Sequence, residues 1–426
     1  MSGPVVGFFA DDLTGASDVL VQAHGGGLSA ALVLDPAGGL PDTDVVGVAG
    51  TARSLAGDEL DAAVRAGVAP LVAAAPQVLL YKVCSTFDSS ATVGSIGRGI
   101  ELLHEAVPGH GPVPVAPAQP SAGRHTAFGN HFGRSGDAVH RLDRHPVMSR
   151  HPVTPMHEAD LRRVLAGQLT GAPDVALLDL PGHAGFDGHW ARLRAGHGPA
   201  FVVDAVTDED LDRVAAALLA DPAAPSLVVG SGGIMAALAR RRGSGAPPGD
   251  GDRGATGPVL AVSASASAVT GDQIDDALGR GWTGVPVPAG AGQQDAEARA
   301  GDAVTAALRR GEDVVAYTVR GPDDPALRHD GADPAATGAR IGRLAAAAVT
   351  GGLTGDVVVC GGDTSGHALV AMGARELRVV APFVPLAPVC RVTDGPQALT
   401  GCRLVLKGGQ AGPPDVLHRF AAGRPR

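Results

Sequence analysis

Short runs of β-branched and apolar residues alternate along this chain with longer stretches in which apolar residues recur every three or four positions. The short runs predict strands that are buried on both faces, and the longer stretches predict amphipathic helices packed against them. This alternation is typical of α/β folds with largely parallel sheets. In the first half, the predicted strands are residues 4–10, 45–49, 78–83, 175–180 and 227–230, and the predicted helices are residues 60–75, 95–105, 158–169 and 208–219.

The alternation is interrupted once, by a stretch rich in Gly, Pro, Ser and charged residues. Such composition is typical of a linker. We therefore predict an N-terminal domain over residues 1–239, a linker over 240–257 and a C-terminal domain over 258–426. The second domain repeats the α/β pattern, with a predicted helix at 270–278 and predicted strands at 259–263, 313–319, 357–360, 377–380 and 404–407.

Composition narrows the classes of function. The chain has 426 residues, 45% hydrophobic and 18% charged, which supplies apolar material for two cores. Its formal net charge of -10 argues against general binding to nucleic acid or to anionic membranes. Four widely spaced cysteines, with no signal peptide and no membrane-spanning run, predict a cytoplasmic protein. A homo-oligomer is compatible with the sequence.

The first polar motif is Asp11-Asp12-Leu13-Thr14-Gly15, which directly follows the first predicted strand. Ligands bind at the carboxyl ends of strands in open α/β sheets, and two adjacent carboxylates are hard to satisfy inside a core. One carboxylate can contact a ligand hydroxyl or act as its base, while Thr14 and Gly15 open a helix whose amides face the ligand. The alternative is that Asp12 or Thr14 only caps that helix.

A second polar motif follows the strand at 78–83. Lys82 is costly to bury unless it meets an anion, and Ser85, Thr86 and Asp88 follow it. An ordinary surface lysine is the alternative. Cys84 fits a structural cysteine better than a nucleophile.

Arg53 follows the strand at 45–49 and is able to bind a carboxylate through two parallel hydrogen bonds. An exposed loop arginine is the alternative. The histidines at 140, 145, 151 and 157 have no metal-ligand spacing, so the segment 143–155 is interpreted as a substrate-capping or structural loop.

The second domain carries three small-residue turns that follow predicted strands. Ser265 and Ser267 lie in the first, Gly361, Gly362, Asp363 and Thr364 in the second, and Gly408 in the third. Glycines admit close backbone approach, and helix N-termini favour phosphate; Asp363 is able to hold Mg²⁺ or its water shell. Neither the Walker A order nor GxGxxG is present. Ordinary tight turns are the alternative.

Taken together and in this order, these motifs resemble the four-carbon acid sugar kinase family. The resemblance rests on residues 10–18, 82–89, 94–97, 149–156, 263–270, 361–366 and 407–409, and so spans nearly the whole chain. Two departures are Asp363, where many relatives carry Glu, and Ala264 with Ala266, which replace residues that are often Gly and Cys.

The resemblance implies two α/β domains with an active-site cleft between them. The N-terminal domain would bind the acid sugar and the C-terminal domain ATP with Mg²⁺. The implied catalytic residues are Asp12 and Asp88, with Asp12 the first choice as base. The implied sugar-binding residues are Asp11, Thr14, Gly15, Arg53, Lys82, Ser85 and Thr86. The implied ATP-binding residues are Ser265, Ser267, Gly361, Gly362, Asp363, Thr364 and Gly408.

The implied reaction is ATP-dependent phosphorylation of the terminal (4-) hydroxyl of a four-carbon acid sugar. The CSTFDS and HPVTPM segments are most similar to the 3-oxo-tetronate branch of the family. A D-threonate or D-erythronate kinase, a non-catalytic acid-sugar sensor and a lyase that uses Lys82 as a Schiff-base amine are the alternatives.

Overall fold

The chain divides into two compact units, which we describe separately. The computed structural model describes residues 3–151, 153–221, 225–246, 254–288, 293–328, 333–384 and 387–423. The first unit comprises Met1–Ala30 and Pro36–Pro247, and the second comprises Ala31–Asp35 and Pro248–Arg426. A short segment from the N-terminal half of the sequence therefore belongs to the second unit. Of the predicted linker, residues 247–253 lie outside the described residues.

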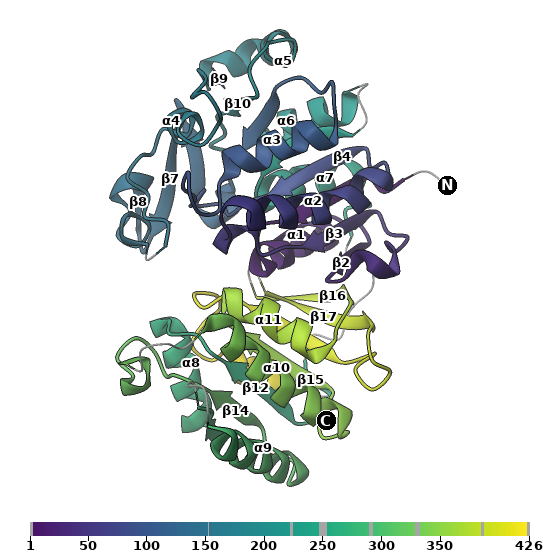
Figure 1. Ribbon diagram of the computed structural model, residues 1–426, viewed down its shortest axis with the longest axis vertical. Helices are drawn as coiled ribbons and strands as arrows, with labels where there is room; N and C mark the ends of the chain where they lie inside the picture. Colours follow the sequence, from purple (N-terminus) through teal and green to yellow (C-terminus); the bar gives the residue numbers. More distant parts are fainter. Residues whose placement is uncertain are drawn as a thin grey trace. The chain divides into compact units, whose positions relative to one another are not determined.

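The first unit is built on a parallel sheet (Figure 1). Its seven strands lie in the order β3 (Val45–Ala49), β1 (Val6–Ala10), β4 (Val78–Lys82), β11 (Ser226–Gly230), β5 (Val113–Ala116), β10 (Ala200–Val203) and β9 (Ala176–Leu178). Every neighbouring pair is parallel. The strands β1, β4 and β11 are buried along their whole length, which explains why their sequences are almost continuously apolar.

Seven α-helices belong to the described part of this unit: α1 (Leu13–Gly25), α2 (Gly57–Ala73), α3 (Ile96–Ala106), α4 (Leu161–Ala166), α5 (Phe186–Arg194), α6 (Asp208–Ala220) and α7 (Gly232–Arg242). Helices α1 and α6 both pack against α7, and α2 packs against α3. The predicted helix at 158–169 is shorter in the structure. The carboxylate of Asp160 accepts a hydrogen bond from the backbone N–H of Arg162 and caps α4, so that helix begins at Leu161.

A small antiparallel sheet that we did not predict follows β5. It consists of β6 (Arg124–Ala127), β7 (Asn130–Ser135) and β8 (Ala138–Arg141). Two short 3₁₀ helices, η4 (Leu142–Arg144) and η5 (Met148–Arg150), continue into the segment that we interpreted as a loop. Pro152 of that segment lies outside the described residues.

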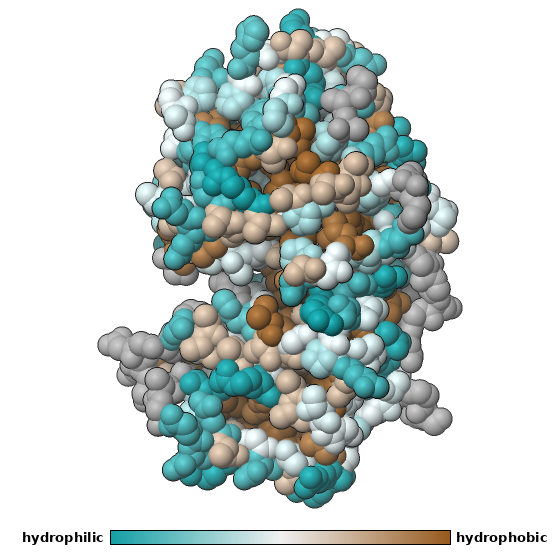
Figure 2. Space-filling model, turned by 45° about the vertical axis from the view of Figure 1, so that its right-hand side comes forward, coloured by the Kyte–Doolittle hydropathy of each residue, from teal (hydrophilic) through white to brown (hydrophobic). Residues whose placement is uncertain are grey.

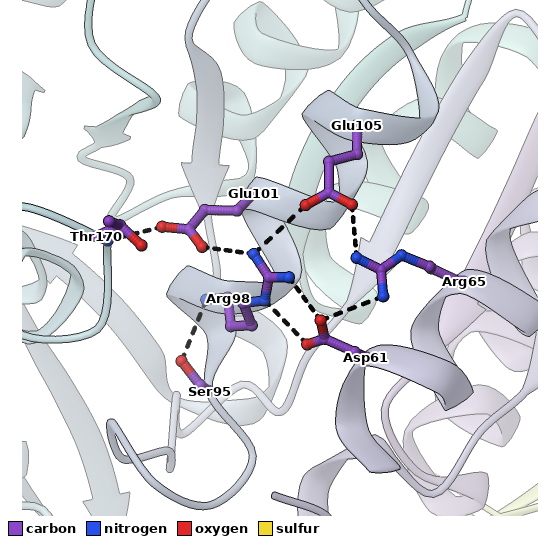
Figure 3. Close-up of polar contacts among 7 residues, drawn as sticks. All are labelled: Asp61, Arg65, Ser95, Arg98, Glu101, Glu105 and Thr170. Carbon is purple, nitrogen blue, oxygen red and sulfur yellow. Dashed lines mark hydrogen bonds and ion pairs between the residues drawn. The ribbon is translucent and has the colours of Figure 1, made fainter. Parts of the chain in front are cut away.

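A polar network ties α3 to its surroundings (Figure 3). Arg98 on α3 donates to both carboxylate oxygens of Asp61 on α2, at 2.9 and 2.5 Å, and to Glu101 at 2.9 Å. Glu101 in turn accepts the backbone N–H of Thr170 at 2.6 Å. The hydroxyl of Ser95 caps α3 by accepting the N–H of Arg98. This network holds the start of α3, which directly follows the polar loop at residues 84–94.

The second unit has a mixed sheet (Figure 1). Its strand order is β13 (Thr283–Pro286), β14 (Val314–Tyr317), β12 (Val259–Ser263), β15 (Asp356–Cys360), β18 (Arg403–Lys407), β17 (Ala387–Asp394), β16 (Glu376–Val384) and β2 (Ala30–Val33). The pairs from β13 to β18 are parallel, whereas β17, β16 and β2 are antiparallel to their neighbours. The described helices are α8 (Ala268–Gly279), α9 (Gln294–Arg309), α10 (Pro334–Thr350), α11 (Gly362–Met372) and α12 (Val416–Ala422).

The fold class agrees with the prediction: both units are α/β with mostly parallel sheets. Within the described residues, no helix combines the length and the apolar character that a membrane crossing requires. On the face shown in Figure 2, hydrophilic residues are interspersed with brown patches.

Candidate active site

Backbone hydrogen bonds align the carboxyl ends of four strands in the first unit. Gly50 donates its N–H to Ala10 at 2.9 Å, and Asp11 donates to Lys82 at 3.0 Å. The N–H of Val83 is bonded to the carbonyl of Gly230 at 2.9 Å. The polar residues that follow β3, β1 and β4 are therefore held at one edge of the sheet, where α/β proteins bind their ligands.

Arg53 joins the two aspartates of the first motif. Its Nε and Nη2 donate to Asp11 Oδ2 and Oδ1 at 3.2 and 3.0 Å, and its Nη1 lies 2.9 Å from Asp12 Oδ2. The side chain of Arg53 keeps 21% of its surface exposed. Two N–H groups of Arg53 are thus hydrogen-bonded to Asp11 and Nη1 is ion-paired with Asp12. A guanidinium group has five N–H donors, so further donors are able to bind a ligand.

Asp12 also caps α1, as the alternative interpretation required. Its Oδ1 accepts the N–H of Gly15 at 2.7 Å, so both of its carboxylate oxygens are occupied. Gly15 itself is tightly surrounded. A Cβ atom at this position would lie 2.5 Å from Asp12 Oδ1 and 2.8 Å from Lys82 Nζ. The side chain of Thr14, in the same helical turn, is half-buried.

Burial raises the pKa of Asp11 from 3.8 to about 6, against the opposing effect of Arg53. Asp18, on α1, also has its pKa raised by burial. It accepts hydrogen bonds from Gln22 and Gln119, both at 3.1 Å, and from the backbone of Gly232 at the start of α7. Asp18 and Gln119 were not among the predicted site residues. The Oε1 atom of Gln119 is buried, and no residue in the described part of the chain forms a hydrogen bond with it.

Lys82 is buried, with 2% of its surface exposed. Its Nζ donates to the carbonyl of Val83 at 2.7 Å and forms no ion pair with any described side chain. The alternative of an ordinary surface lysine is therefore wrong. A buried ammonium group next to the N-terminal turn of α1 is expected to attract an anion.

The loop after β4 is held in an unusual conformation. The hydroxyl of Thr86 donates to Asp88 Oδ1 at 2.5 Å, and Oδ2 of Asp88 has no partner among the described residues. Phe87, between them, is buried at a φ of +55°, which is strained for an aromatic residue. His131 Nε2 bonds to the carbonyl of Ser85 at 2.7 Å and so ties this loop to β7. Burial raises the pKa of Cys84 to about 11, which agrees with a structural thiol.

The histidines of the 140–157 segment have structural contacts. The Nδ1 atom of His145 accepts the N–H groups of Val147 and Met148, both at 3.2 Å. The Nδ1 atom of His151 bonds to Thr154. No cluster of three or more His, Cys, Asp or Glu side chains suited to a metal ion occurs within the described ranges.

The second unit has a comparable row of strand ends. Thr318 donates its N–H to the carbonyl of Ser263, and Gly361 donates to that of Lys407, both at 3.0 Å. A Cβ on Gly409 would lie 2.7 Å from the Oγ of Ser265, so the third turn is packed closely against the first. Gly361 has a φ of +118°, a conformation that favours glycine. The side chains of Asp363 and Thr364 lie outside the described residues.

Lys407 lies at the centre of these turns and is only 1% exposed. Its Nζ donates to Thr270 Oγ1 at 3.2 Å and to the carbonyl of Gly408 at 3.1 Å, and it forms no ion pair with a described side chain. The Oγ of Ser267 is buried and has no hydrogen-bond partner among the described residues. Helices α8 and α11 both begin here, and no described side chain caps either of them. A buried cation, a buried hydroxyl and two helix N-termini are groups that can bind phosphate oxygens.

Lys407 was not among the predicted site residues, although the sequence contains a signal for it. Lys82 and Lys407 are the only lysines in the chain, and the remaining basic residues are arginines. Both lysines are the last residue of a buried strand. A residue type that is absent everywhere else points to a requirement for a compact ammonium group at these two positions.

Comparison with known proteins agrees with this division of polar sites. Residues 6–238 match the model of a sugar-binding N-terminal domain, and residues 260–417 match that of a nucleotide-binding C-terminal domain. The chain is 35% identical to a 3-oxo-isoapionate kinase of Paraburkholderia graminis, over 99% of this chain and 95% of that protein. The chain belongs to the four-carbon acid sugar kinase family.

Two further family members show the range of named substrates. A 3-oxo-tetronate kinase of Cupriavidus necator is 31% identical over 97% of this chain and 95% of its own length. A D-threonate kinase of Bordetella bronchiseptica is 32% identical over 99% of this chain and 98% of its own length. The chain is accordingly a kinase of acid sugars.

Solved structures share the fold. A crystal structure from Salmonella typhimurium LT2 aligns with a TM-score of 0.81 at 24% identity, covering 97% of this chain and 98% of that one. A Haemophilus influenzae protein aligns with a TM-score of 0.73 at 23% identity, covering 98% and 99%.

Proposed function

We propose that this family member transfers the γ-phosphate of ATP to the terminal hydroxyl of a 3-oxo acid sugar. The observation that carries the nucleotide half of the proposal is the environment of Lys407. Its ammonium group is buried among neutral oxygen atoms, beside the Oγ of Ser267 and two helices that no described side chain caps. Such a group is stabilised when a polyanion supplies the missing negative charge.

In this proposal, the phosphates contact the turns at Ser265, Ser267, Gly361, Gly362 and Gly408, with Lys407 as the cation. Asp363 and Thr364 belong to the second of these turns. Mg²⁺ is expected to arrive bound to the nucleotide phosphates and to neutralise their charge.

The sugar acid binds in the first unit. Its carboxylate takes the free N–H groups of Arg53 and the ammonium of Lys82, while Thr14, Ser85 and Thr86 offer hydroxyl and backbone groups. Asp11 keeps Arg53 in place by accepting a hydrogen bond from its Nη2. The hydrogen bond from the N–H of Gly15 to Asp12 keeps the first turn of α1 in place.

The proton of the attacking hydroxyl goes to Asp88. The hydroxyl oxygen forms a bond to the γ-phosphorus, the bond from the γ-phosphorus to the β,γ-bridging oxygen breaks, and ADP leaves. Asp88 Oδ2 is unpartnered among the described residues, whereas both oxygens of Asp12 are occupied. We therefore propose that Asp88 is the base and that Asp12 positions Arg53. From the sequence, Asp12 was the first choice as base and Asp88 the second.

The relatives' names support the proposed substrate class. The protein at 35% identity and several at 28–31% are named as kinases of 3-oxo acids, and one at 32% as a D-threonate kinase. A 3-oxo acid sugar, with 3-oxo-tetronate as the first choice, is therefore our proposed substrate.

The test is a coupled assay of ADP formation with ATP, Mg²⁺ and a panel of four-carbon acids and their 3-oxo forms. Phosphorus NMR of the product identifies the phosphorylated hydroxyl. We expect Asp88→Asn to lower kcat by roughly a thousandfold at unchanged ATP affinity, within the range for loss of a general base. ATP consumption with none of these acids would refute the proposed function, and full turnover by Asp88→Asn would refute the base assignment.

A further inference from the structure

Arg124 is a half-buried arginine that forms no ion pair with a described carboxylate. It begins β6, and its Nη1 donates to the backbone carbonyls of Ala122, Gly123 and Arg134 at 3.3, 3.4 and 3.2 Å. Its Nε is buried, and neither Nε nor Nη2 has a hydrogen-bond partner within the described ranges. The edge of the guanidinium group formed by Nε and Nη2 is therefore left without an acceptor.

Arg53 differs from Arg124 in this respect. The Nε and Nη2 of Arg53 donate to the two oxygens of Asp11, and its Nη1 lies 2.9 Å from Asp12 Oδ2. The edge that best matches a pair of acceptor lone pairs is thus occupied in Arg53 and open in Arg124. Donors that are buried without a partner cost free energy, which an acceptor oxygen of a ligand would recover.

The small antiparallel sheet turns Arg124 toward the loop that follows β4. His131 on β7 pairs with Thr126, two residues after Arg124 on β6, and successive side chains of a strand point to opposite faces. Arg124 and His131 therefore lie on the same face of this sheet. On that face, His131 Nε2 is bonded to the carbonyl of Ser85 at 2.7 Å, so the face is directed at the loop.

The loop places Arg124 near the middle of the proposed substrate site. Burial lowers the pKa of Arg124, and Cys84 is the neighbouring group that opposes this effect. In the proposed function, Lys82 binds the carboxylate of the acid sugar and Asp88 takes the proton of its terminal hydroxyl. Cys84 and Ser85 lie between these two residues along the chain, so a group beside them is expected to face the central carbons of the substrate.

The chemistry of this face favours a keto oxygen. A guanidinium group donates hydrogen bonds and accepts none, so a carbonyl oxygen, which only accepts, suits it fully. A hydroxyl oxygen also accepts, but its own hydrogen then needs a separate acceptor. The hydroxyl of Thr126 and Nδ1 of His131 are already bonded to each other at 2.9 Å, and the other ring nitrogen of His131 is bonded to the loop.

We propose that Arg124 recognises the 3-oxo group of the acid sugar and makes the protein select 3-oxo acids over 3-hydroxy acids, an inference that rests on the proposed function. The Nε–Nη2 edge of Arg124 donates to the keto oxygen, while the carboxylate remains with Arg53 and Lys82. Arg124 takes no part in the proton transfer, so its contribution is to the choice of substrate.

The test compares two substitutions of Arg124 with a matched one at Arg134. Arg124→Met removes every donor, whereas Arg124→Lys keeps the charge and a donor for the turn carbonyls. Arg134 is exposed and lies three residues after His131 on β7, hence on the opposite face, so Arg134→Met is the control. Calorimetric titrations give the dissociation constants of freshly prepared 3-oxo-tetronate and of the 3-hydroxy acids D-threonate and D-erythronate. A dissociation constant does not depend on the fraction of protein that is folded.

We expect both Arg124 variants to bind the 3-oxo acid more weakly by roughly tenfold to a hundredfold, the range for a hydrogen bond to a charged group. Their affinity for the 3-hydroxy acids should change little, and Arg134→Met should bind all three acids as the unmodified protein does. Unchanged affinity for the 3-oxo acid, or an equal loss for both kinds of acid, would overturn this inference and leave the kinase proposal standing. If the unmodified protein neither binds nor phosphorylates any of these acids, both are overturned.

Discussion

Arg53 holds Asp11 through two parallel hydrogen bonds, from Nε and Nη2 to the two carboxylate oxygens. The same guanidinium group also reaches Asp12, so one arginine fixes both acids of the motif that follows β1. The motif is thus organised internally before any ligand arrives. In the proposed function, the remaining N–H donors of Arg53 bind the ligand.

Replacement of Arg53 by lysine keeps the charge and removes the forked geometry. We expect Arg53→Lys to lower kcat/KM for the acid sugar by at least a hundredfold, because a single ammonium group cannot hold Asp11 and Asp12 together. Initial rates at varied sugar and saturating ATP measure this. Arg65→Lys, at an exposed ion pair, is the control and should change neither kcat/KM nor stability by much. Wild-type kinetics in Arg53→Lys would contradict the role given to the fork.

The raised pKa of Asp11 predicts a pH-dependent stability. The folded protein retains a proton on Asp11 up to about pH 6, whereas the unfolded chain releases it near 3.8. The stabilisation is therefore fully present below 3.8 and is lost as the pH rises through 6. Relative to Asp11→Asn, the unmodified protein should lose up to about 3 kcal/mol between pH 4 and 7. Urea unfolding of both proteins across this range measures the difference, and a constant difference would show that the pKa is not raised.

Gly15 is predicted to be intolerant of any side chain. The Cβ of Gly15→Ala would collide with Asp12 Oδ1 and Lys82 Nζ, so we expect kcat/KM for the sugar to fall by roughly a hundredfold and stability by about 1–3 kcal/mol. Gly25→Ala in the same helix is the matched control, since nothing lies within 4 Å of its added Cβ. It should be neutral or slightly stabilising. Similar effects of the two substitutions would contradict the crowding at Gly15.

The two lysines are predicted to serve different ligands. Lys407→Met should weaken ATP binding without sugar by at least tenfold, because a buried charge partner of the phosphates is lost. Lys82→Met should retain the binary affinity for ATP and lose affinity for the acid sugar. Separate titrations with each ligand make the comparison. Loss of ATP affinity in Lys82→Met alone would reverse the assignment.

Ser267 carries a polar atom that folding leaves unsatisfied. Ser267→Ala removes this cost, so we expect the free energy of unfolding without ligand to stay the same or to rise by up to about 1 kcal/mol. ATP binding should weaken at the same time. Thermal melts with and without ATP separate the two effects. Ser263→Ala is a useful comparison, because the Ser263 hydroxyl accepts an N–H from Ser265 and its loss should destabilise the turn.

The sequence was informative where polar residues lie at the ends of predicted strands. Three different strands end at or just before Asp11, Arg53 and Lys82, and parallel pairing brings those strand ends together. What it did not reveal depends on long-range pairing. Residues 30–33 are apolar like many short strands, and only the contact with β16 assigns β2 to the second unit. The pairing of Arg53 with Asp11 was missed for the same reason. Asp11 lies 42 residues away in the sequence, so the local pattern around Arg53 indicated only an arginine that binds a ligand.

The residues missed at the site share a further cause. Asp18 lies within helix α1, and Gln119 follows β5. Nothing in the local sequence around either residue indicates that the two side chains are hydrogen-bonded to each other. The signal for Lys407 is that lysine is rare in the whole sequence, and a search for local patterns does not detect this.

The scarcity of lysine gives this kinase a property of practical value. Apart from the terminal α-amine, Lys82 and Lys407 are the only primary amines in the protein, and one lies in each unit. Biosynthetic incorporation of lysine labelled with ¹³C at Cε would therefore produce two side-chain resonances, each a separate reporter of one half of the molecule, without modifying the two buried ammonium groups. Each ligand should then perturb its own signal, so occupancy of the two halves can be followed in a single spectrum.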